Sequence, residues 1–273
     1  MPFSKTRLAP TPSGYLHLGN VLSFALTATL ARAKGARILL RIDDMDRERV
    51  EEAYVRDIFD TLTFLDIPWD DGPGDASEFW RTYSQVLRLD LYQEALDQLA
   101  ASGTVFACTC SRMQTYQGNC LEKGLPLDTP NAAWRLAITG ALPYFVVRKK
   151  DGVPAYQLAS LIDDLYYGID LIVRGEDLHP STLAQQQLAT ILGKDAFARV
   201  QFVHHPLLME TPERKLSKSE GATSIRYLRA QGLNAEDVYK TIAEMLRLEG
   251  PVADWRSLGE AFLPRLDAAR TAP

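Results

Sequence analysis

The chain has 273 residues, of which 46% are hydrophobic and 24% are charged, and its formal net charge is −5. This balance excludes a disordered polar chain and a protein that coats nucleic acid through overall basicity, although a local basic tract on an acidic protein can still bind a phosphate backbone. No stretch approaches the ~18 consecutive apolar residues of a membrane helix and no apolar leader follows Met1, so we expect a cytoplasmic monomer with no membrane partner.

The N-terminal elements predict the start of a parallel sheet. Residues 3–9 are expected to form a short strand that enters a turn rich in proline and glycine. An apolar helix follows at about 18–34, ended by Gly35, and residues 38–42 form a buried strand. A strand, a crossover helix and a second strand make a βαβ unit, and ligands of such folds bind at the carboxyl ends of the strands.

An interruption follows this first unit. Helical periodicity spans about 50–65 and about 77–101. Residues 104–150 instead hold short strands, glycines and prolines, which fits an insertion between two halves of the sheet. The halves are expected to rejoin near Tyr156.

The second half of the sheet contains a predicted strand at 169–173, a helix at about 181–192, and a strand with a loop at 200–208 that leads into residues 215–219. Only helical pieces are expected after residue 219. The predicted fold is therefore α/β. We expect four segments: the first half of the sheet domain at 1–103, an inserted subdomain at 104–150, the second half at 151–220 and a short C-terminal helical extension at 221–273.

The first motif, His17-Leu18-Gly19-Asn20, lies at the predicted strand-to-helix junction. A helix N-terminus presents unpaired backbone N–H groups and the positive end of its dipole to phosphate. Gly19 leaves room for a nucleotide, and His17 can donate hydrogen bonds to phosphate oxygens. Taken alone the motif is weak, because a histidine before a helix is more often structural.

The second motif, Lys215-Leu216-Ser217-Lys218-Ser219, follows the last predicted strand in a loop. Two lysines on a short loop can bind phosphoryl oxygens while charge redistributes in the transition state, so they act by electrostatics and positioning. A solvated basic turn is the alternative for this pentapeptide alone.

Together the two motifs resemble the paired signatures of the class I aminoacyl-tRNA synthetases, usually written HIGH and KMSKS. Four further segments are similar to the glutamyl branch of that family: Arg7-Leu8-Ala9-Pro10-Thr11-Pro12-Ser13-Gly14, Arg41-Ile42-Asp43-Asp44-Met45-Asp46, Tyr156-Gln157-Leu158-Ala159 and Val173-Arg174-Gly175-Glu176-Asp177. The resemblance covers roughly residues 5–225. It implies a Rossmann-type sheet with an inserted subdomain, and an ATP-dependent ligase that uses ATP with Mg²⁺ and takes glutamate.

The resemblance also implies site residues. It implies that glutamate contacts Arg7, Leu8, Ala9, Pro10, Thr11, Asp43, Tyr156 and Arg174, that ATP contacts Thr11, His17, Gly19, Asn20, Lys215, Ser217 and Lys218, and that His17, Gly19, Lys215 and Lys218 are catalytic. Glutamate has two carboxylates, and planar guanidinium groups bind carboxylates through paired hydrogen bonds. Structural ion pairs of Arg7 and Arg174 with Asp43, Asp44 or Asp177 are the alternative. A tyrosine such as Tyr156 in an apolar strand is, by itself, usually a core residue.

Asp43 departs from the family pattern, which has glutamate at this position to contact the substrate ammonium group. The aspartate side chain is one methylene shorter. A closer backbone, a bridging water or a preference for a slightly different amino acid could each accommodate the difference.

Three cysteines, Cys108, Cys110 and Cys120, lie close together in the sequence, and their odd number and spacing favour a metal or a reducing compartment over a disulfide framework. Thiolates are favoured ligands of Zn²⁺, and structural zinc is four-coordinate. The resemblance implies one structural zinc with Tyr116 as the fourth ligand. The other expectations are three reduced cysteines without metal, or a different fourth ligand: Asn119, Glu122 or water.

The short chain after Ser219, together with the cysteines, resembles the group of glutamyl-queuosine tRNA(Asp) synthetases. That resemblance implies transfer of activated glutamate to the queuosine base in the anticodon stem-loop of tRNA(Asp). A compact glutamyl-tRNA synthetase that charges a 3′ end, an enzyme with a carrier-protein acceptor, a different nucleotidyl transferase and an inactive RNA-binding paralogue are the alternatives.

Overall fold

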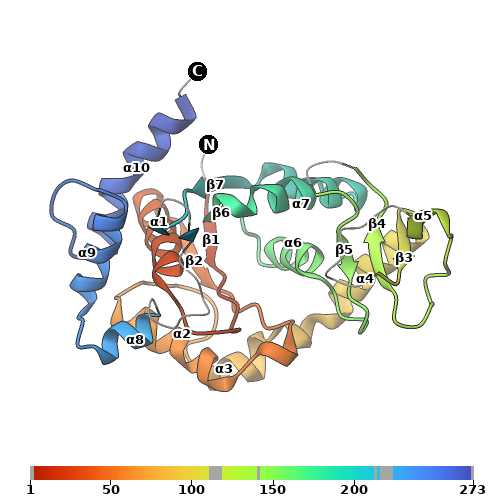
Figure 1. Cartoon of the computed structure of the whole chain (residues 1–273), viewed down its shortest axis with the longest axis horizontal. Coiled ribbons are helices and arrows are strands. Elements are labelled where there is room, and N and C mark those ends of the chain that lie inside the picture. Colours follow the sequence, from red (N-terminus) through yellow and green to blue (C-terminus); the bar gives the residue numbers. More distant parts are fainter. Residues whose placement is uncertain (1–2, 111–118, 140–141, 212–213, 216–223, 272–273) are drawn as a thin grey trace. The chain divides into compact units, whose positions relative to one another are not determined.

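A computed structural model describes residues 3–110, 119–139, 142–211, 214–215 and 224–271 (Figure 1). The chain forms two compact units. Unit 1 contains residues 1–85, 169–177 and 201–273, and unit 2 contains residues 86–168 and 178–200. The four segment boundaries drawn from the sequence stay predictions. No helix in the described part of the chain has the length and apolar character needed to cross a membrane.

Unit 1 is built on a parallel four-stranded sheet in the order β2-β1-β6-β7 (Figure 1). Its strands are β1 (Lys5–Leu8), β2 (Arg37–Leu40), β6 (Leu171–Gly175) and β7 (Gln201–His205). All three pairings are parallel, which confirms the predicted α/β fold class. The chain passes from β1 to β2 on one side and returns as β6 on the other, so strand order reverses at β1, where open α/β sheets bind ligands.

Helix α1 (Leu18–Lys34) connects β1 to β2 and has the predicted bounds. Its apolar side chains, among them Val21, Leu22 and Leu26, are fully buried in the core that also holds Leu8 and Val173. Gly35 ends the helix with φ 66°, a left-handed conformation that costs glycine little. Local apolar periodicity and a glycine cap are sufficient to place this helix from the sequence.

The remaining helices of unit 1 complete this core. They are α2 (Glu52–Phe64), α3 (Ala76–Glu78), α8 (Ile225–Ala230), α9 (Ala235–Met245) and α10 (Trp255–Thr271). Helix α10 lies against α1, and a Cβ at Gly259 would come within 2.0 Å of Thr29 Oγ1. Any larger residue at position 259 would therefore separate the two helices. The short hairpin of β8 (Met209–Thr211) and β9 (Arg214–Lys215) precedes this helical extension.

The single helix predicted at 77–101 is wrong. A π-type turn, η2 (Phe79–Tyr83), and a 3₁₀ turn, η3 (Gln85–Arg88), separate α3 from α4 (Leu89–Ala101). Ser84 is extended with φ −55° and ψ 139°. The cause is the fully buried Asp44, which accepts hydrogen bonds from Ser84 Oγ at 2.6 Å and from the Gln85 backbone N–H at 2.7 Å. Tertiary hydrogen bonds therefore override the helical periodicity.

Unit 2 holds the region that interrupts the parallel sheet in the sequence. Its antiparallel sheet consists of β3 (Val105–Cys108), β4 (Ala133–Leu136) and β5 (Val146–Arg148), with α5 (Asn119–Glu122) beside β3. Its other helices are α6 (Tyr156–Tyr166) and α7 (His179–Ile191), with α4 packed on α6. A buried ion pair fixes that packing, since Arg88 Nε lies 3.0 Å from Asp163 Oδ1, which also accepts from the Tyr92 hydroxyl at 2.6 Å.

Candidate active site

Two buried arginines project from one face of the unit 1 sheet. Thr6 of β1 is aligned with Leu171 of β6, and successive side chains on a strand alternate between faces. Leu8 and Val173 point into the core that α1 covers, so Arg7 and Arg174 point to the opposite face. Arg7 is 5% exposed and Arg174 is 4% exposed. The register therefore brings together, at the strand-order reversal, the two residues predicted to bind the carboxylates of glutamate.

An aromatic side chain supports one of these arginines. In β7, Phe202 pairs with Ile172 and His204 pairs with Arg174, so both side chains share the arginine face. The Arg174 guanidinium carbon lies 5.1 Å from the centroid of the Phe202 ring, which is stacked on His204 at 6.2 Å. A planar guanidinium stacks well on an aromatic face, and the contact limits its rotation. Phe202 was not among the residues predicted from the sequence. Only its position on β7, which places it on the same face of the sheet as Arg174, could have identified it.

Asp43 lies beyond the end of β2, where the chain still runs beside β1. The backbone N–H of Arg41 donates to Leu8 O and that of Asp43 to Pro10 O, both at 2.9 Å. The Asp43 carboxylate is bound by Arg41, with Nε to Oδ1 at 2.7 Å and Nη2 to Oδ2 at 3.0 Å. This ion pair was not among the pairs considered from the sequence.

The first motif forms the N-terminus of α1 as predicted. His17 Nδ1 accepts from the Gly19 backbone N–H at 3.1 Å, and Asn20 Oδ1 accepts from the His17 N–H at 3.1 Å. Because Nδ1 is the acceptor, a neutral His17 carries its proton on Nε2, the tautomer that donates a hydrogen bond. A Cβ at Gly19 would lie 2.9 Å from His17 Cε1, so glycine here also makes room for the imidazole.

The other residues predicted to contact glutamate or ATP, near this turn and in the second motif, differ in exposure and position. Leu8 packs in the core, Pro10 is buried and Thr11 is exposed. A contact between Leu8 and a ligand would therefore use backbone atoms. Lys215 is the last residue of β9 and pairs with Met209 of β8. Ser217 and Lys218 lie outside the described residues.

Tyr156 belongs to unit 2, where it is the first residue of α6 and 43% exposed. Its predicted place in an apolar strand is wrong, since the segment from Tyr156 to Tyr166 is an amphipathic helix. The adjacent Gln157 donates a hydrogen bond from Nε2 to Ser181 Oγ of α7 at 2.9 Å. This bond connects the beginnings of α6 and α7 within unit 2.

A buried histidine at the end of β7 was not predicted. His205 Nε2 lies 2.6 Å from Ser23 Oγ of α1, and Nδ1 lies 2.9 Å from Pro206 O. A carbonyl only accepts, so Nδ1 donates and Nε2 accepts from the serine hydroxyl. Burial lowers the pKa of His205 below its usual value, while Pro206 O and the carboxylates of Asp177 and Glu176 oppose that effect. His205 thus fixes α1 to the carboxyl end of β7 in its neutral form.

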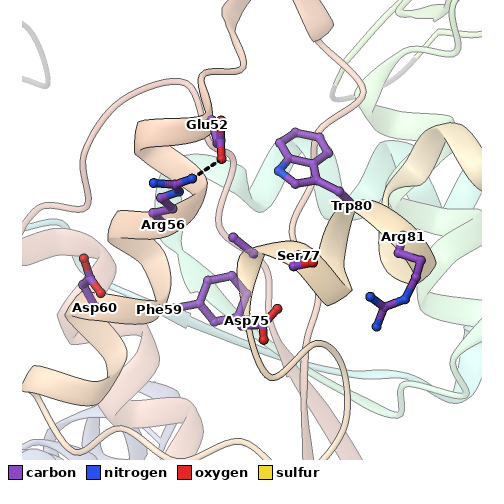
Figure 2. A pocket seen from close by; sticks show the side chains of 9 residues that line it. Glu52, Arg56, Phe59, Asp60, Asp75, Ser77, Trp80 and Arg81 are labelled. Atoms are coloured by element: carbon purple, nitrogen blue, oxygen red, sulfur yellow. Dashed lines mark hydrogen bonds and ion pairs between the residues drawn. The ribbon is translucent and has the colours of Figure 1, made fainter.

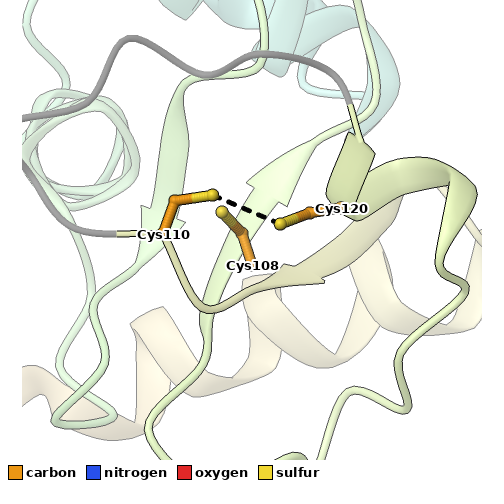
Figure 3. A group of neighbouring side chains, drawn as sticks. All are labelled: Cys108, Cys110 and Cys120. Atoms are coloured by element: carbon orange, nitrogen blue, oxygen red, sulfur yellow. Dashed lines mark hydrogen bonds between the residues drawn. The ribbon is translucent and has the colours of Figure 1, made fainter.

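The three cysteines of unit 2 form a cluster (Figure 3). The Sγ atoms of Cys108, Cys110 and Cys120 all lie within 4.8 Å of one another, and those of Cys110 and Cys120 are 3.3 Å apart. Sulfurs around a tetrahedral Zn²⁺ with bonds of about 2.3 Å are about 3.8 Å apart, so this cluster fits three zinc ligands. Hydrogen bonding to Cys120 and Cys108 raises the pKa of Cys110 to about 11. Tyr116 lies outside the described residues.

The cavity of about 860 Å³ drawn in Figure 2 lies in another part of unit 1, between α2 and the segment of α3 and η2. Arg56, Trp80 and Arg81 are among its lining residues, and Glu52 forms an ion pair with Arg56 there. None of the predicted site residues that the structure describes lines it. The candidate site is therefore defined by the ends of β1 and β6 and by the His17 turn.

Comparison with known proteins gives concordant results. The family model described as tRNA synthetases class I (E and Q), catalytic domain, matches residues 4–125 and 131–252. A glutamyl-Q tRNA(Asp) synthetase of Synechococcus sp. strain CC9605 is 37% identical over 90% of this chain and 84% of its own length. A glutamate–tRNA ligase 2 of Syntrophus aciditrophicus strain SB is 30% identical over 88% of this chain, which spans 56% of that ligase.

The fold of a solved structure agrees. The crystal structure of a glutamate–tRNA synthetase from Elizabethkingia anophelis has a TM-score of 0.75 and 22% identity, covering 95% of this chain and 66% of that protein. This likeness concerns the fold alone. With most of its length matched by the family model, the chain belongs to the catalytic-domain family of the class I tRNA synthetases for E and Q.

Proposed function

We propose that this protein activates glutamate with ATP and transfers the glutamyl group to the queuosine base of tRNA(Asp). The observation that carries the proposal is the pair of buried guanidinium groups, Arg7 and Arg174, on one face of the sheet where strand order reverses. Two guanidinium groups match the two carboxylates of glutamate, because each planar guanidinium can bind one carboxylate through paired hydrogen bonds.

The activation step joins glutamate to the α-phosphorus of ATP. A carboxylate oxygen attacks that phosphorus, the bond to the bridging oxygen breaks, and pyrophosphate leaves. The positive end of the α1 dipole and the Nε2–H of His17 would stabilise the developing charge. The full proposed set for ATP with Mg²⁺ is Thr11, His17, Gly19, Asn20, Lys215, Ser217 and Lys218.

The transfer step consumes the adenylate. An acceptor hydroxyl attacks the acyl carbon, AMP leaves, and the hydroxyl proton passes to solvent. The queuosine acceptor is supported by the similarity to the synthetase of Synechococcus, which carries the name glutamyl-Q tRNA(Asp) synthetase. The similarity to the ligase of Syntrophus keeps a tRNA 3′ end as the second candidate.

A structural zinc is part of the proposal. Cys108, Cys110 and Cys120 would hold it with Tyr116, and the cluster geometry of the three sulfurs supports this assignment. The bound ion would hold β3 and α5 together in place of a larger apolar core.

Two assays test the function. The first is glutamate-dependent exchange between pyrophosphate and ATP without tRNA. Exchange with a different amino acid only would overturn the glutamate assignment, and no exchange with any amino acid would favour the inactive paralogue.

The second assay offers radiolabelled glutamate and ATP with tRNA(Asp) that contains or lacks queuosine and is trimmed at the 3′ end by exonuclease. Intact tRNA(Glu) is offered in parallel. Labelling of trimmed, queuosine-containing tRNA supports the acceptor. Labelling of intact tRNA(Glu) alone would identify a compact synthetase that charges the 3′ end.

A further inference from the structure

Two segments of unit 1 that are far apart in the sequence meet beside the His17 turn. Ser224 forms an antiparallel bridge with His17, and the Ile225 backbone N–H donates to Leu16 O at 2.8 Å. Ser224 also caps α8, since its Oγ accepts from the Tyr227 N–H at 3.2 Å. The start of α8 is therefore hydrogen-bonded to the residues directly before α1.

Side chains reinforce this junction. The Arg226 guanidinium carbon lies 4.8 Å from the centroid of the Tyr15 ring, and that ring meets Tyr54 edge-on at 4.9 Å. Asp57 of α2 is 4% exposed and accepts a hydrogen bond from the Leu16 backbone N–H. Its carboxylate is also attracted to Arg226. Arg226 thus combines a cation–π contact with a favourable interaction with a buried carboxylate.

The junction matters because it lies directly before His17. Tyr15 and Leu16 precede His17 in the chain, and the His17 Nδ1 atom accepts from the Gly19 backbone N–H at the first turn of α1. Contacts that hold Tyr15, Leu16 and Ser224 in place therefore also hold the segment that carries the His17 imidazole.

We propose that Arg226 and Tyr15 are positioning residues for adenylate formation: their contact holds the start of α8 against the His17 turn and so fixes the orientation of the His17 imidazole. This inference rests on the proposed function. Neither residue is assigned a contact with glutamate or ATP. Their effect reaches the reaction through the alignment of groups that bind phosphate only in the transition state, so it is expressed in kcat.

The same helix offers a matched control. The Arg229 guanidinium carbon lies 4.6 Å from the centroid of Phe64 at the end of α2. Arg226 and Arg229 are both exposed arginines of α8 that stack on an aromatic ring of unit 1. Only Arg226 contacts the segment that leads into His17. A purely structural role of the cation–π contacts predicts similar consequences at both positions.

The experiment compares Arg226→Ala, Arg229→Ala, Tyr15→Leu and Tyr15→Phe in glutamate-dependent pyrophosphate exchange, with Tm recorded for each. We expect Arg226→Ala and Tyr15→Leu to lower kcat about two- to fivefold, the size of a lost exposed cation–π contact, with the KM for glutamate unchanged from wild type. Tyr15→Phe keeps the ring and retains wild-type kcat, as does Arg229→Ala.

The double variant Arg226→Ala/Tyr15→Leu tests whether the two residues act as one unit. We expect its kcat to match that of either single variant, because the contact is lost once. Equal losses of kcat in Arg226→Ala and Arg229→Ala, or fully additive losses in the double variant, overturn the positioning role. Wild-type protein without glutamate-dependent exchange overturns the proposed function, and this inference with it.

Discussion

Arg41 binds both carboxylate oxygens of Asp43 in a buried fork, with the two side chains 2% and 10% exposed. The fork fixes the position of the shorter carboxylate, so Asp43 needs no extra methylene to be held in one orientation. The pair is neutral as a whole. A substrate ammonium that meets Asp43 would therefore be bound by directed hydrogen bonds more than by net charge.

Removing one member of this pair leaves a buried charge behind. We expect Asp43→Asn to lower the free energy of unfolding by about 3–5 kcal/mol, and the double change Arg41→Met/Asp43→Leu to recover much of that loss. Urea unfolding measures both. Arg32 and Asp70 form a similar two-bond pair, with both distances at 2.9 Å, but at 37% and 26% exposure. Asp70→Asn is the control, with an expected loss of about 0–1 kcal/mol. Equal losses at Asp43 and Asp70 would contradict this account.

Arg174→Lys keeps the charge and loses the planar fork. We expect the KM for glutamate in pyrophosphate exchange to rise about tenfold or more, because lysine cannot reproduce paired hydrogen bonds to a carboxylate. The KM for ATP stays near wild type. Arg148→Lys is the control, since Arg148 stacks on Trp134 at 4.9 Å in unit 2 and has no predicted role. An unchanged KM for glutamate in Arg174→Lys would remove Arg174 from the substrate pocket.

The buried His205 makes stability depend on pH. Burial holds the pKa of His205 below its usual 6.5. At pH values between 6.5 and the folded-state pKa, the unfolded chain therefore binds more protons than the folded chain. Stability therefore falls as the pH decreases from about 6.5, by at most about 1.4 kcal/mol per pH unit for one proton. His205→Gln is expected to flatten this slope in urea unfolding between pH 7 and pH 5.5. The control is His179→Gln at an exposed position of α7. The same slope in wild type and His205→Gln would show that other groups cause it.

The cysteine cluster predicts about one equivalent of zinc in protein purified without added metal. Cys120→Ser is expected to lose the ion and to lower Tm, because metal binding and folding of this region are coupled. Metal analysis with a chromogenic chelator gives the stoichiometry. Tyr116→Phe, compared with Asn119→Ala and Glu122→Ala, identifies the fourth ligand by the variant that releases zinc most readily. Wild-type protein with no zinc and three freely titratable thiols would favour the reduced cluster without metal.

The sequence by itself determined the features that depend on neighbouring residues. The bounds of α1 follow from its apolar run and from Gly35, and the strands β1, β2, β6 and β7 follow from short buried runs between turns. The motif around His17 also needs only its own segment, because its hydrogen bonds join residues 17 to 20. Local periodicity and turn chemistry decide all of these.

Only the tertiary structure decided the relations between distant segments. The register of β1 against β6 decides that Arg7 and Arg174 project from the same face of the sheet. The path of the chain after β2 decides which residue pairs with Asp43. Asp44 breaks the predicted helix at Ser84, and Ser23 meets His205 through the packing of α1 on the sheet. These contacts join residues far apart in sequence and depend on register and burial, which no local pattern of residue types encodes.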